Sequence, residues 1–469
     1  MKKIVIFGAG AVGSSVAETL SHEENDITLI DRDETALSQK LEYLDIKTIC
    51  GTACDPETLD EADIVDADLV LAVTDNDDTN ILVCQLAHML GSRPTVIARL
   101  RNPEFHKRKD ELFGCEADSK KIPIDSIFSP EQLVTRQILT LINHPGALQI
   151  VEFAGGKVQL VAIRADEGGK LVGHRIEELR EHLPTVDSRV AAIYREDRPI
   201  IPKRDTVIQP KDEVFFVAAH EHITNIMTEL RSVEMSYGNR VMLVGAGNIG
   251  TRLARELEQV QWRVKLIEYD RARATTVSHQ LAEGITVVHG NATDKDLMMR
   301  ENIESTDVFC AVTNEDEVNI LSAMMAKQLG AKRTMALINN SAYAALLEHT
   351  GIDSVISPSL LTISALLQDI RKGDMVAVHS LRRGAAEAIE TVVHGSESDS
   401  TVVGCTIGEL KLPEGANVGA ILRKDEVLIA HSNIVIEDED HVILFIVDKG
   451  DKQKQIERVQ KLFEPGPLW

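Results

Sequence analysis

Two glycine-rich turns in this sequence have the residue types needed to hold a phosphate. Each follows a short apolar segment, precedes a predicted helix and has the pattern GxGxxG, formed by Gly8, Gly10 and Gly13 in the first turn and by Gly245, Gly247 and Gly250 in the second. In such a turn the first glycine permits a tight bend, the second lets the backbone approach a pyrophosphate, and the third lets helix and strand pack closely. The helix amino terminus offers unpaired amides and a partial positive charge to the phosphates.

An acidic residue follows each turn at the same distance. Asp31 lies 18 residues after Gly13, and Glu268 lies 18 residues after Gly250, each at the end of the next predicted strand. A carboxylate in that place accepts hydrogen bonds from ribose hydroxyls and repels a 2′-phosphate. The pattern therefore predicts two adenine nucleotide sites per chain that prefer NAD(H), ATP or ADP over NADP(H). The alternative at each site is a turn that serves packing alone.

The elements that hold these turns are also expected twice, because the repeat extends well beyond the glycines. Residues 70–91 align with 308–330, where Asn80 recurs as Asn319, and residues 190–218 align with 418–446. Strands are predicted near residues 3–7, 27–30, 46–49, 69–73 and 95–99, and again near 240–244, 264–267, 285–288, 307–312 and 334–338. Helical patterns lie between the strands, so each half is expected to begin with a doubly wound parallel sheet of the α/β class.

A helix and a small strand-rich unit follow each predicted α/β unit. Ser129 before Pro130 and Ser357 before Pro358 are helix-start signals. The predicted organisation is two Rossmann domains at 1–123 and 239–355, two crossover helices at 124–147 and 356–374, and two small α+β domains at 148–233 and 375–462.

The second crossover helix is too apolar for a solvated surface. Its apolar residues are Leu360, Leu361, Ile363, Leu366 and Leu367. They predict an interface at this helix, and the alternative is packing within its own domain.

Composition limits the classes of function. Lys and Arg total 50 against 74 Asp and Glu, giving a net charge of −24, which argues against binding nucleic acid or anionic lipid directly. No stretch approaches the roughly 18 apolar residues of a spanning helix, and no signal peptide precedes the first strand, so a cytoplasmic location is expected. Any membrane role would then need a protein partner. The six cysteines show no metal-ligand spacing, and no metal site is predicted.

The order of dinucleotide-binding domain, crossover helix and small strand-rich domain resembles the RCK module, also called KTN, a regulator of potassium conductance. Two complete modules without membrane segments resemble the TrkA family of bacterial Trk potassium-uptake systems over essentially the whole chain, and residues 307–333 are especially similar. One departure concerns the residue after the glycine that ends the third strand. The family commonly has Asp there, whereas Thr52 and Asn291 occupy the two positions here.

The resemblance implies a regulatory subunit and no enzymatic activity. Members of this family are similar in forming homotetrameric rings that respond to NAD(H), ATP or ADP. The rings lie at the cytoplasmic face of the bacterial inner membrane, on an ion-conducting membrane subunit, here a Trk-type potassium-conducting one. The contacts carried over by position are Gly8, Ala9, Gly10, Ala11, Val12, Gly13, Asp31, Thr52, Thr74 and Asp75 in module one, and Gly245, Ala246, Gly247, Asn248, Ile249, Gly250, Glu268, Asn291, Thr313 and Asn314 in module two.

Arg99 is a further candidate contact in module one only. It ends the fifth predicted strand and can reach phosphate, or it is a solvated charge at the end of that strand. Its counterpart in module two lies near Leu337 or Ile338. The two nucleotide sites are therefore expected to differ.

Two other functions stay open at this stage. An NAD-dependent oxidoreductase needs a sizeable substrate domain and a positioned acid or base near the nicotinamide, and the small units, of roughly 85 residues, offer no such constellation. A regulator of a different cation channel or antiporter fits the same sequence, because the partner is not encoded in this chain.

Overall fold

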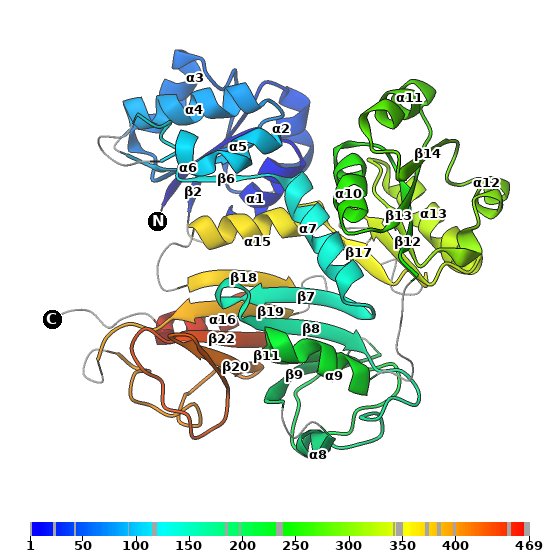
Figure 1. Ribbon diagram of the computed structural model, residues 1–469. Helices are drawn as coiled ribbons and strands as arrows, with labels where there is room; N and C mark the ends of the chain where they lie inside the picture. The colour runs from blue at the N-terminus through cyan, green and yellow to red at the C-terminus, as the bar shows by residue number, and fades with distance from the viewer. Residues whose placement is uncertain are drawn as a thin grey trace. The chain divides into compact units, whose positions relative to one another are not determined.

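The structure is a computed structural model (Figure 1). It describes residues 2–21, 25–41, 44–91, 93–114, 120–182, 186–196, 198–230, 238–340, 343, 350–370, 375–381, 386–396, 400–447 and 452–463. The chain divides into two compact units, Met1–Thr135 with Ser357–Ile370, and Arg136–Ile356 with Arg371–Trp469. The units do not follow the sequence repeat, because one helix of module two belongs to the first unit.

The first unit is built on a parallel sheet of six strands in the order β3-β2-β1-β4-β5-β6. The strands are β1 (Lys3–Phe7), β2 (Asp26–Asp31), β3 (Lys47–Cys50), β4 (Leu69–Ala72), β5 (Thr95–Arg99) and β6 (Ser126–Phe128). The helices around them are α1 (Ala11–Ser21), α2 (Glu34–Leu41), α3 (Pro56–Glu61), α4 (Asp77–Leu90), α5 (Pro103–Lys107) and α6 (Lys109–Leu112). The strand order reverses between β1 and β4, so the crevice where such sheets bind ligands lies at the first glycine turn.

The second unit contains a matching parallel sheet in the order β14-β13-β12-β15-β16-β17. Its strands are β12 (Arg240–Val244), β13 (Arg263–Glu268), β14 (Ile285–His289), β15 (Val308–Ala311), β16 (Arg333–Leu337) and β17 (Ser354–Ile356). Its helices are α10 (Asn248–Gln259), α11 (Arg271–Gln280), α12 (Lys295–Arg300) and α13 (Asp316–Gln328). The two sheets confirm the predicted α/β fold class, with the second glycine turn at the same switch point.

The edge strands β6 and β17 are absent from the sequence-based prediction. Each has three residues, too few to show a strand period. A carboxylate beside each strand holds it to its neighbour: Asp125 Oδ2 accepts the Val96 amide and Asp353 Oδ2 accepts the Thr334 amide, both at 2.8 Å. In each case a hydrogen bond between residues distant in sequence helps to hold a strand that is too short to be recognised from its own residues.

Two small antiparallel sheets also lie in the second unit. Their strand orders are β10-β9-β11-β8-β7 and β18-β19-β22-β20-β21. The first comprises β7 (Ala147–Phe153), β8 (Val158–Arg164), β9 (Ser188–Arg195), β10 (Arg198–Ile200) and β11 (Glu213–Ala219), and the second β18 (Met375–Leu381), β19 (Ala386–Val392), β20 (Ala416–Arg423), β21 (Glu426–Ile429) and β22 (His441–Val447). Short helices α8 (Leu179–His182) and α9 (Ile223–Glu229) accompany the first sheet, and α16 (Lys452–Phe463) accompanies the second.

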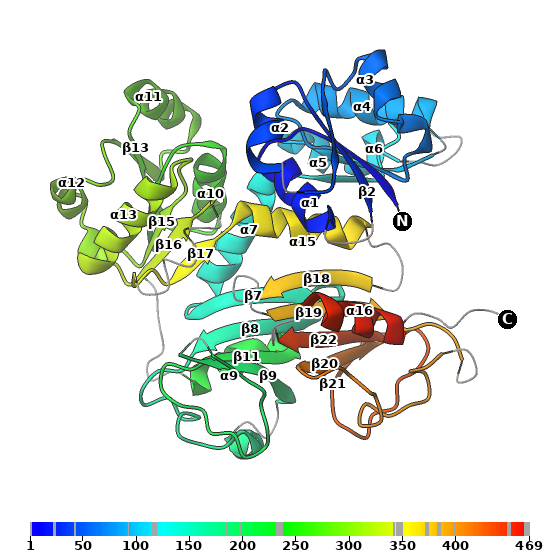
Figure 2. The same cartoon turned by 180° about the vertical axis from the view of Figure 1, so that it is seen from behind.

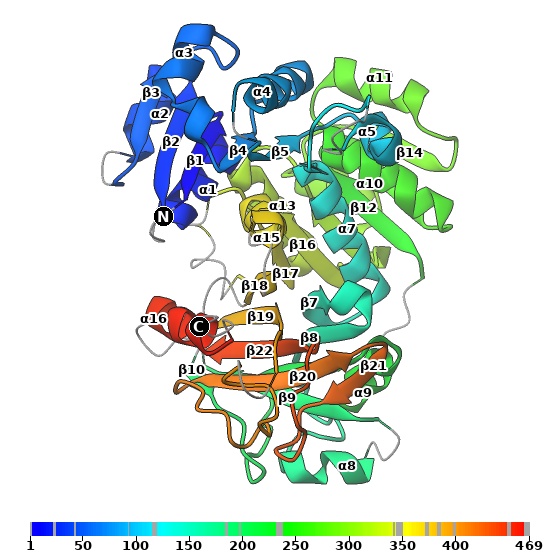
Figure 3. The same ribbon diagram turned by 90° about the vertical axis from the view of Figure 1, so that its left-hand side faces the viewer.

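The two small sheets share one core. Phe153, Tyr194 and Phe215 from the first sheet are buried in one cluster with Ile443 and Phe445 from the second. Figure 3 shows the strands of the two sheets next to one another. Burying large aromatic and aliphatic side chains is the main stabilising term in such a contact. The small domains of the two modules therefore form a single folded body.

Helix α15 (Pro358–Ile370) packs with the opposite module. It follows the second Rossmann domain in sequence, yet it lies beside α1 of the first (Figure 2). Leu366 is 1% exposed in the core of the first sheet, and Ile363 packs against that core. Leu361 is half-buried and Leu360 is 37% exposed, whereas the side chain of Leu367 lies outside the described residues. The apolar face of this helix thus contacts the other module of the same chain.

The carboxyl end of α7 (Pro130–Asn143) is held by a buried arginine of the second unit. Arg333, 3% exposed, donates from Nη1 to the Leu141 carbonyl at 2.6 Å and from Nη2 to the Ala147 carbonyl. A cation there satisfies carbonyls that a helix end leaves unpaired and complements the helix dipole. The matching position in the first sheet holds Thr95, which has no guanidinium, so the first sheet cannot make the equivalent bond.

Candidate nucleotide-binding sites

The three glycines of the first turn have three different surroundings. Gly8 has φ +110°, and a Cβ there would lie 3.0 Å from the Thr74 backbone. A Cβ on Gly13 would lie 1.8 Å from the Gly8 carbonyl oxygen, so only hydrogen fits. A Cβ on Gly10 would meet nothing within 4 Å. The backbone at Gly10 therefore faces open space, directly before α1 begins at Ala11.

The second turn repeats this geometry. Gly245 has φ +96°, a Cβ on Gly250 would lie 1.9 Å from the Gly245 carbonyl oxygen, and one on Gly247 would meet nothing within 4 Å. Helix α10 begins at the next residue, Asn248. Both turns thus present an open backbone at a helix amino terminus, which suits an anionic ligand.

The remaining predicted turn residues differ in exposure. Ala9, Val12 and Ala246 are buried, Ile249 is half-buried, and Ala11 and Asn248 are exposed. Val12 lies in the hydrophobic core of the first sheet. A ligand contact from the buried residues would therefore have to come from their backbone atoms.

Both predicted ribose-binding acids brace their own turn. Asp31 Oδ2 accepts the Ala9 amide at 2.6 Å. Glu268 Oε2 accepts the Ala246 amide at 2.7 Å, so the longer side chain makes the same bond. A carboxylate has about four lone-pair sites, which leaves capacity for a ribose hydroxyl. The acids therefore lie beside the turns, as a ribose contact requires.

A buried asparagine ties together the ends of neighbouring strands at each site. Asn80 is 0% exposed; its Oδ1 accepts the Thr74 hydroxyl at 2.6 Å, and its Nδ2 donates to the Arg99 carbonyl at 2.8 Å. Asn319, also 0% exposed, makes the same bonds, accepting from the Thr313 hydroxyl at 2.7 Å and donating to the Leu337 carbonyl at 2.8 Å. Neither asparagine is among the predicted contacts, although their recurrence at one spacing was a usable signal. They position Thr74 and Thr313 under the glycine turns.

The other predicted contacts lie at the carboxyl ends of strands. Thr52 and Asp75 follow β3 and β4, and Asn291 and Asn314 follow β14 and β15; all four residues are exposed. The Asn291 side chain accepts the Thr293 amide at 2.9 Å and so forms a local turn. Because carboxyl ends of parallel strands share one edge, these residues lie at the same edge as the glycine turns.

Arg99 is no solvated charge. Its side chain is 15% exposed, and Nη2 lies 3.2 Å from Oε1 of Glu131, the second residue of α7. Burial lowers the pKa of the guanidinium, while Glu131 opposes that shift. Among the described residues, Nε of Arg99 has no hydrogen-bond partner. In module two the bond from Asn319 identifies Leu337 as the matching residue, so the cation is missing there.

Module two has a different cation beside its turn. Arg273 on α11 donates from Nε to the Ala246 carbonyl at 2.9 Å. The matching residue of module one is Ala36. Arg273 was not among the predicted contacts, although the substitution of arginine for alanine between the repeats was visible in the sequence. Each candidate site thus has an arginine that the other site lacks, and the two arginines come from different elements.

The described part of the chain lacks two kinds of feature. It contains no group of three His, Cys, Asp or Glu side chains arranged to hold a metal ion. No helix within it has the length and apolar character needed to cross a membrane.

Comparison with known proteins places these features in a family. The chain matches the TrkA-N domain at residues 4–129 and 241–358 and the TrkA-C domain at 160–231 and 397–463. It is 51% identical to the Trk system potassium uptake protein TrkA of Halomonas elongata, over 99% of each chain, and 50% identical to that of Vibrio alginolyticus, over 100% of each.

A solved structure shares the fold at low identity. The GsuK channel bound to NAD aligns with a TM-score of 0.60 at 16% identity, covering 97% of this chain and 78% of that one. Full-length identity near one half, with both domain types matched twice, carries the assignment. The chain belongs to the TrkA family of Trk potassium-uptake proteins, which is built from tandem RCK modules and is not an enzyme family.

Proposed function

We propose that this protein is a cytoplasmic regulatory subunit that binds NAD(H), ATP or ADP and gates a Trk-type potassium channel or transporter. The observation that carries the proposal is the duplicated glycine turn, open at Gly10 and Gly247 and followed at once by a helix amino terminus. The relatives in Halomonas and Vibrio are named potassium uptake proteins, and the GsuK channel that shares the fold is bound to NAD.

In each site the nucleotide would lie across the carboxyl edge of the sheet. Its phosphates would face the open backbone at Gly10 or Gly247, and its ribose would face Asp31 or Glu268. The predicted contacts at strand ends, including Thr52, Thr74, Asp75, Asn291, Thr313 and Asn314, would border the ligand on one side. Arg99 and Arg273 would supply the charge that distinguishes the two sites.

A route from ligand to helix is present in module one. Arg99 pairs with Glu131, and Glu131 lies in the first turn of α7, where its carboxylate also accepts the Ser129 hydroxyl at 3.1 Å. A phosphate that took over Arg99 would leave Glu131 with only its longer ion pair to Arg101, whose Nε lies 3.7 Å from Oε1. The first turn of α7 would then be less firmly held, which links phosphate number to the position of the crossover helix.

The energy needed for gating is modest. Moving a two-state assembly from 1:99 to 99:1 takes about 5.5 kcal/mol of differential binding. A homotetrameric ring on a potassium-conducting membrane subunit would hold eight sites, so each needs about 0.7 kcal/mol on average. One additional charge-assisted hydrogen bond to phosphate supplies that amount.

Calorimetric titration of the full chain with NADH, ADP and ATP tests the binding proposal. Arg99→Leu gives site one the residue of module two, and Arg273→Ala gives site two the residue of module one. Each is expected to weaken ATP or ADP binding about tenfold at its own site only, because one charged contact to phosphate is lost. Arg255→Ala, an exposed arginine on the body of α10, is the control and should change nothing.

Potassium flux in vesicles containing the membrane subunit tests gating. Addition of the wild-type chain should make flux depend on the nucleotide, and Arg99→Leu should reduce that dependence. Nucleotide bound without any change in flux would argue against gating of this partner. Steady NADH oxidation with small carbonyl substrates would instead favour an oxidoreductase.

A further inference from the structure

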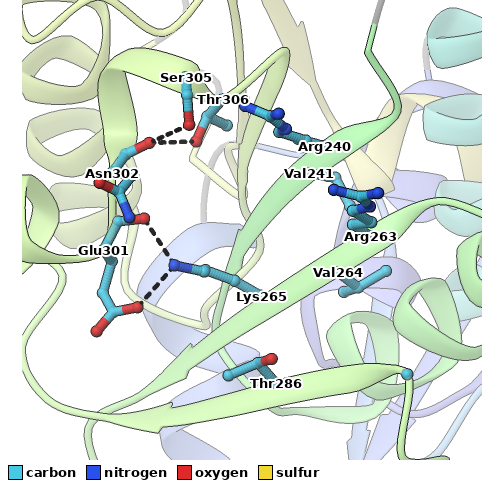
Figure 4. Close-up of a pocket in the computed structure, with 11 residues that line it drawn as sticks. Arg240, Val241, Arg263, Val264, Lys265, Thr286, Glu301, Asn302, Ser305 and Thr306 are labelled. Carbon is cyan, nitrogen blue, oxygen red and sulfur yellow. Dashed lines mark hydrogen bonds and ion pairs between the residues drawn. The ribbon is translucent and has the colours of Figure 1, made fainter.

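A pocket of about 400 Å³ lies in the second unit at the sheet edge opposite the glycine turn (Figure 4). Its walls come from the beginnings of β12, β13 and β14 and from residues 301–306, which connect α12 to β15. The glycine turn follows the end of β12, whereas Arg240 begins that strand. The pocket and the candidate nucleotide site are therefore at opposite ends of the same strands.

Three cations line one face of the sheet in this pocket. Arg240 of β12 and Arg263 of β13 are register partners, and Lys265 follows two residues later. Side chains alternate along a strand and neighbouring strands are about 4.8 Å apart, so the three lie on one face close together. Like charges placed directly opposite each other repel. The arrangement thus raises local electrostatic energy unless anions are present.

Among the residues that the structure describes, one of the three cations has an ion-pair partner. Lys265 Nζ lies 2.9 Å from Oε2 of Glu301 and donates to the Glu301 carbonyl at 2.8 Å. The guanidinium groups of Arg240 and Arg263, both exposed, make no hydrogen bond or ion pair with any other residue that the structure describes. Figure 4 shows the two arginine side chains on neighbouring strands and the lysine reaching Glu301. The guanidinium groups of these two arginines are therefore available to a ligand.

Module one shows that the fold does not require this charge. There Lys3 is the register partner of Asp26, an opposite charge, and its Nζ lies 3.3 Å from Oδ2 of Asp66. Replacing Asp26 by Arg263 in module two turns an attractive pair into a repulsive one. A structural role would favour the neutral arrangement, so the positive pocket calls for another explanation.

We propose that this pocket binds a small anion carrying phosphate or carboxylate groups, as a site separate from the nucleotide sites. Arginine's planar fork matches two oxygens of either group, and two forks side by side suit a ligand with two anionic groups. The exposed Thr286, register partner of Lys265, adds a hydroxyl donor at the same face. The volume falls within the usual range for small-molecule pockets, about 300–1,000 Å³.

The test is calorimetric titration of the full chain with citrate and, separately, with inorganic pyrophosphate, at low salt and with NADH saturating the nucleotide sites. Arg263→Asp reproduces the charge pair of module one and is expected to weaken binding at least about tenfold. Arg255→Asp makes the same change in net charge on the body of α10 and should leave affinity unchanged. Arg240→Gln, which cannot repel or attract by charge, serves as a second loss variant and should also weaken binding.

Several results would overturn the proposal. The proposal fails if neither citrate nor pyrophosphate binds to the wild-type chain. It also fails if the wild type and Arg263→Asp bind the probe with equal affinity. Equal weakening by Arg255→Asp would show a general charge effect. A probe that binds without NADH but not with NADH saturating would be assigned to the nucleotide sites. Binding of citrate alone or pyrophosphate alone supports the site and identifies the group it selects.

Discussion

The two Rossmann domains of this chain have the same glycine turns and the same buried asparagine, but different charged residues around them. A Cβ on Gly13 or Gly250 would lie at nearly the same distance from a carbonyl oxygen, and Asn80 and Asn319 make matching bonds. The arginines without a counterpart differ, by contrast: Arg99 at the end of β5 pairs with Glu131 in one domain, and Arg273 on α11 donates to the turn in the other.

The difference teaches which positions the fold constrains. A glycine that touches backbone and an asparagine that is fully buried cannot change without a clash or an unpaired polar group. Arg273 is exposed and meets water as well as protein, so it can be exchanged at small cost in stability. Arg99 is mostly buried, and its charge is balanced by Glu131. We therefore expect the shared parts to set the shape of the bound nucleotide and the differing charges to set its preference.

The largest expected effect tests the shared part. Gly13→Ala and Gly250→Ala each place a Cβ less than 2 Å from a carbonyl oxygen, at 1.8 and 1.9 Å. Both should lower the free energy of unfolding by more than about 3 kcal/mol and abolish binding at their own site. Thermal denaturation and titration with NADH measure the two effects.

Gly247→Ala is the control for this pair. Gly247 has φ −68° and open space around its Cβ position. Stability should be retained while NADH binding weakens at site two. If Gly250→Ala had the melting temperature of the wild type, the comparison between the two domains would fail, because the second turn would then tolerate a Cβ that the first does not.

A smaller effect is expected where the domains differ. Arg333→Met removes the donors to the Leu141 and Ala147 carbonyls and leaves those acceptors buried. We expect a loss of about 3 kcal/mol in the free energy of unfolding, measured by urea denaturation. Thr95→Met at the matching place in the first sheet should cost clearly less. Similar losses for both would show that α7 does not depend on Arg333.

The smallest effect depends on pH. Burial raises the pKa of Asp307, but the Lys332 ammonium and the amides of Gly238 and Arg240 outweigh it and hold the pKa below its usual value of 3.8. A lowered folded-state pKa stabilises above the unfolded value, and this stabilisation is lost as pH falls through the folded value. Asp307→Asn should therefore cost about 1 kcal/mol at pH 7 and progressively less below about pH 4.

Asp68 is the matched comparison for that experiment. It accepts the Lys3 amide at 2.8 Å, but Pro94 stands where module two has Lys332. Asp68→Asn should cost less than Asp307→Asn at pH 7, measured by urea denaturation across the same pH series. An equal cost would mean that Lys332 contributes nothing to the difference.

Local patterns predicted much of the fold and part of the candidate sites. The five main strands of each sheet, the glycine turns and the acids Asp31 and Glu268 all follow from residues close together in sequence. Their signals are strong because strand period and turn chemistry act over a few residues. The edge strands β6 and β17 escaped prediction because Asp125 and Asp353 hold them from the side.

These local patterns do not predict contacts between segments that are distant in sequence. The pairing of Arg99 with Glu131 joins residues 32 positions apart, and the bond from Arg333 to Leu141 joins residues 192 apart. The Arg240 and Arg263 pocket depends on the register between two strands. The sequence shows that these residues are charged. Which residues they contact is decided only when the chain folds.

The sequence by itself determined that this protein has two phosphate-type turns, each in an α/β unit, because glycine placement, strand period and the following acid are local requirements. Tertiary structure alone decided that α15 belongs with the first Rossmann domain, that the small sheets share one core, and that the two units exchange elements between modules. The physical reason is that a duplicated sequence offers equivalent apolar faces twice. Packing energy, which depends on the whole surface that each face can bury, then selects among the possible pairings.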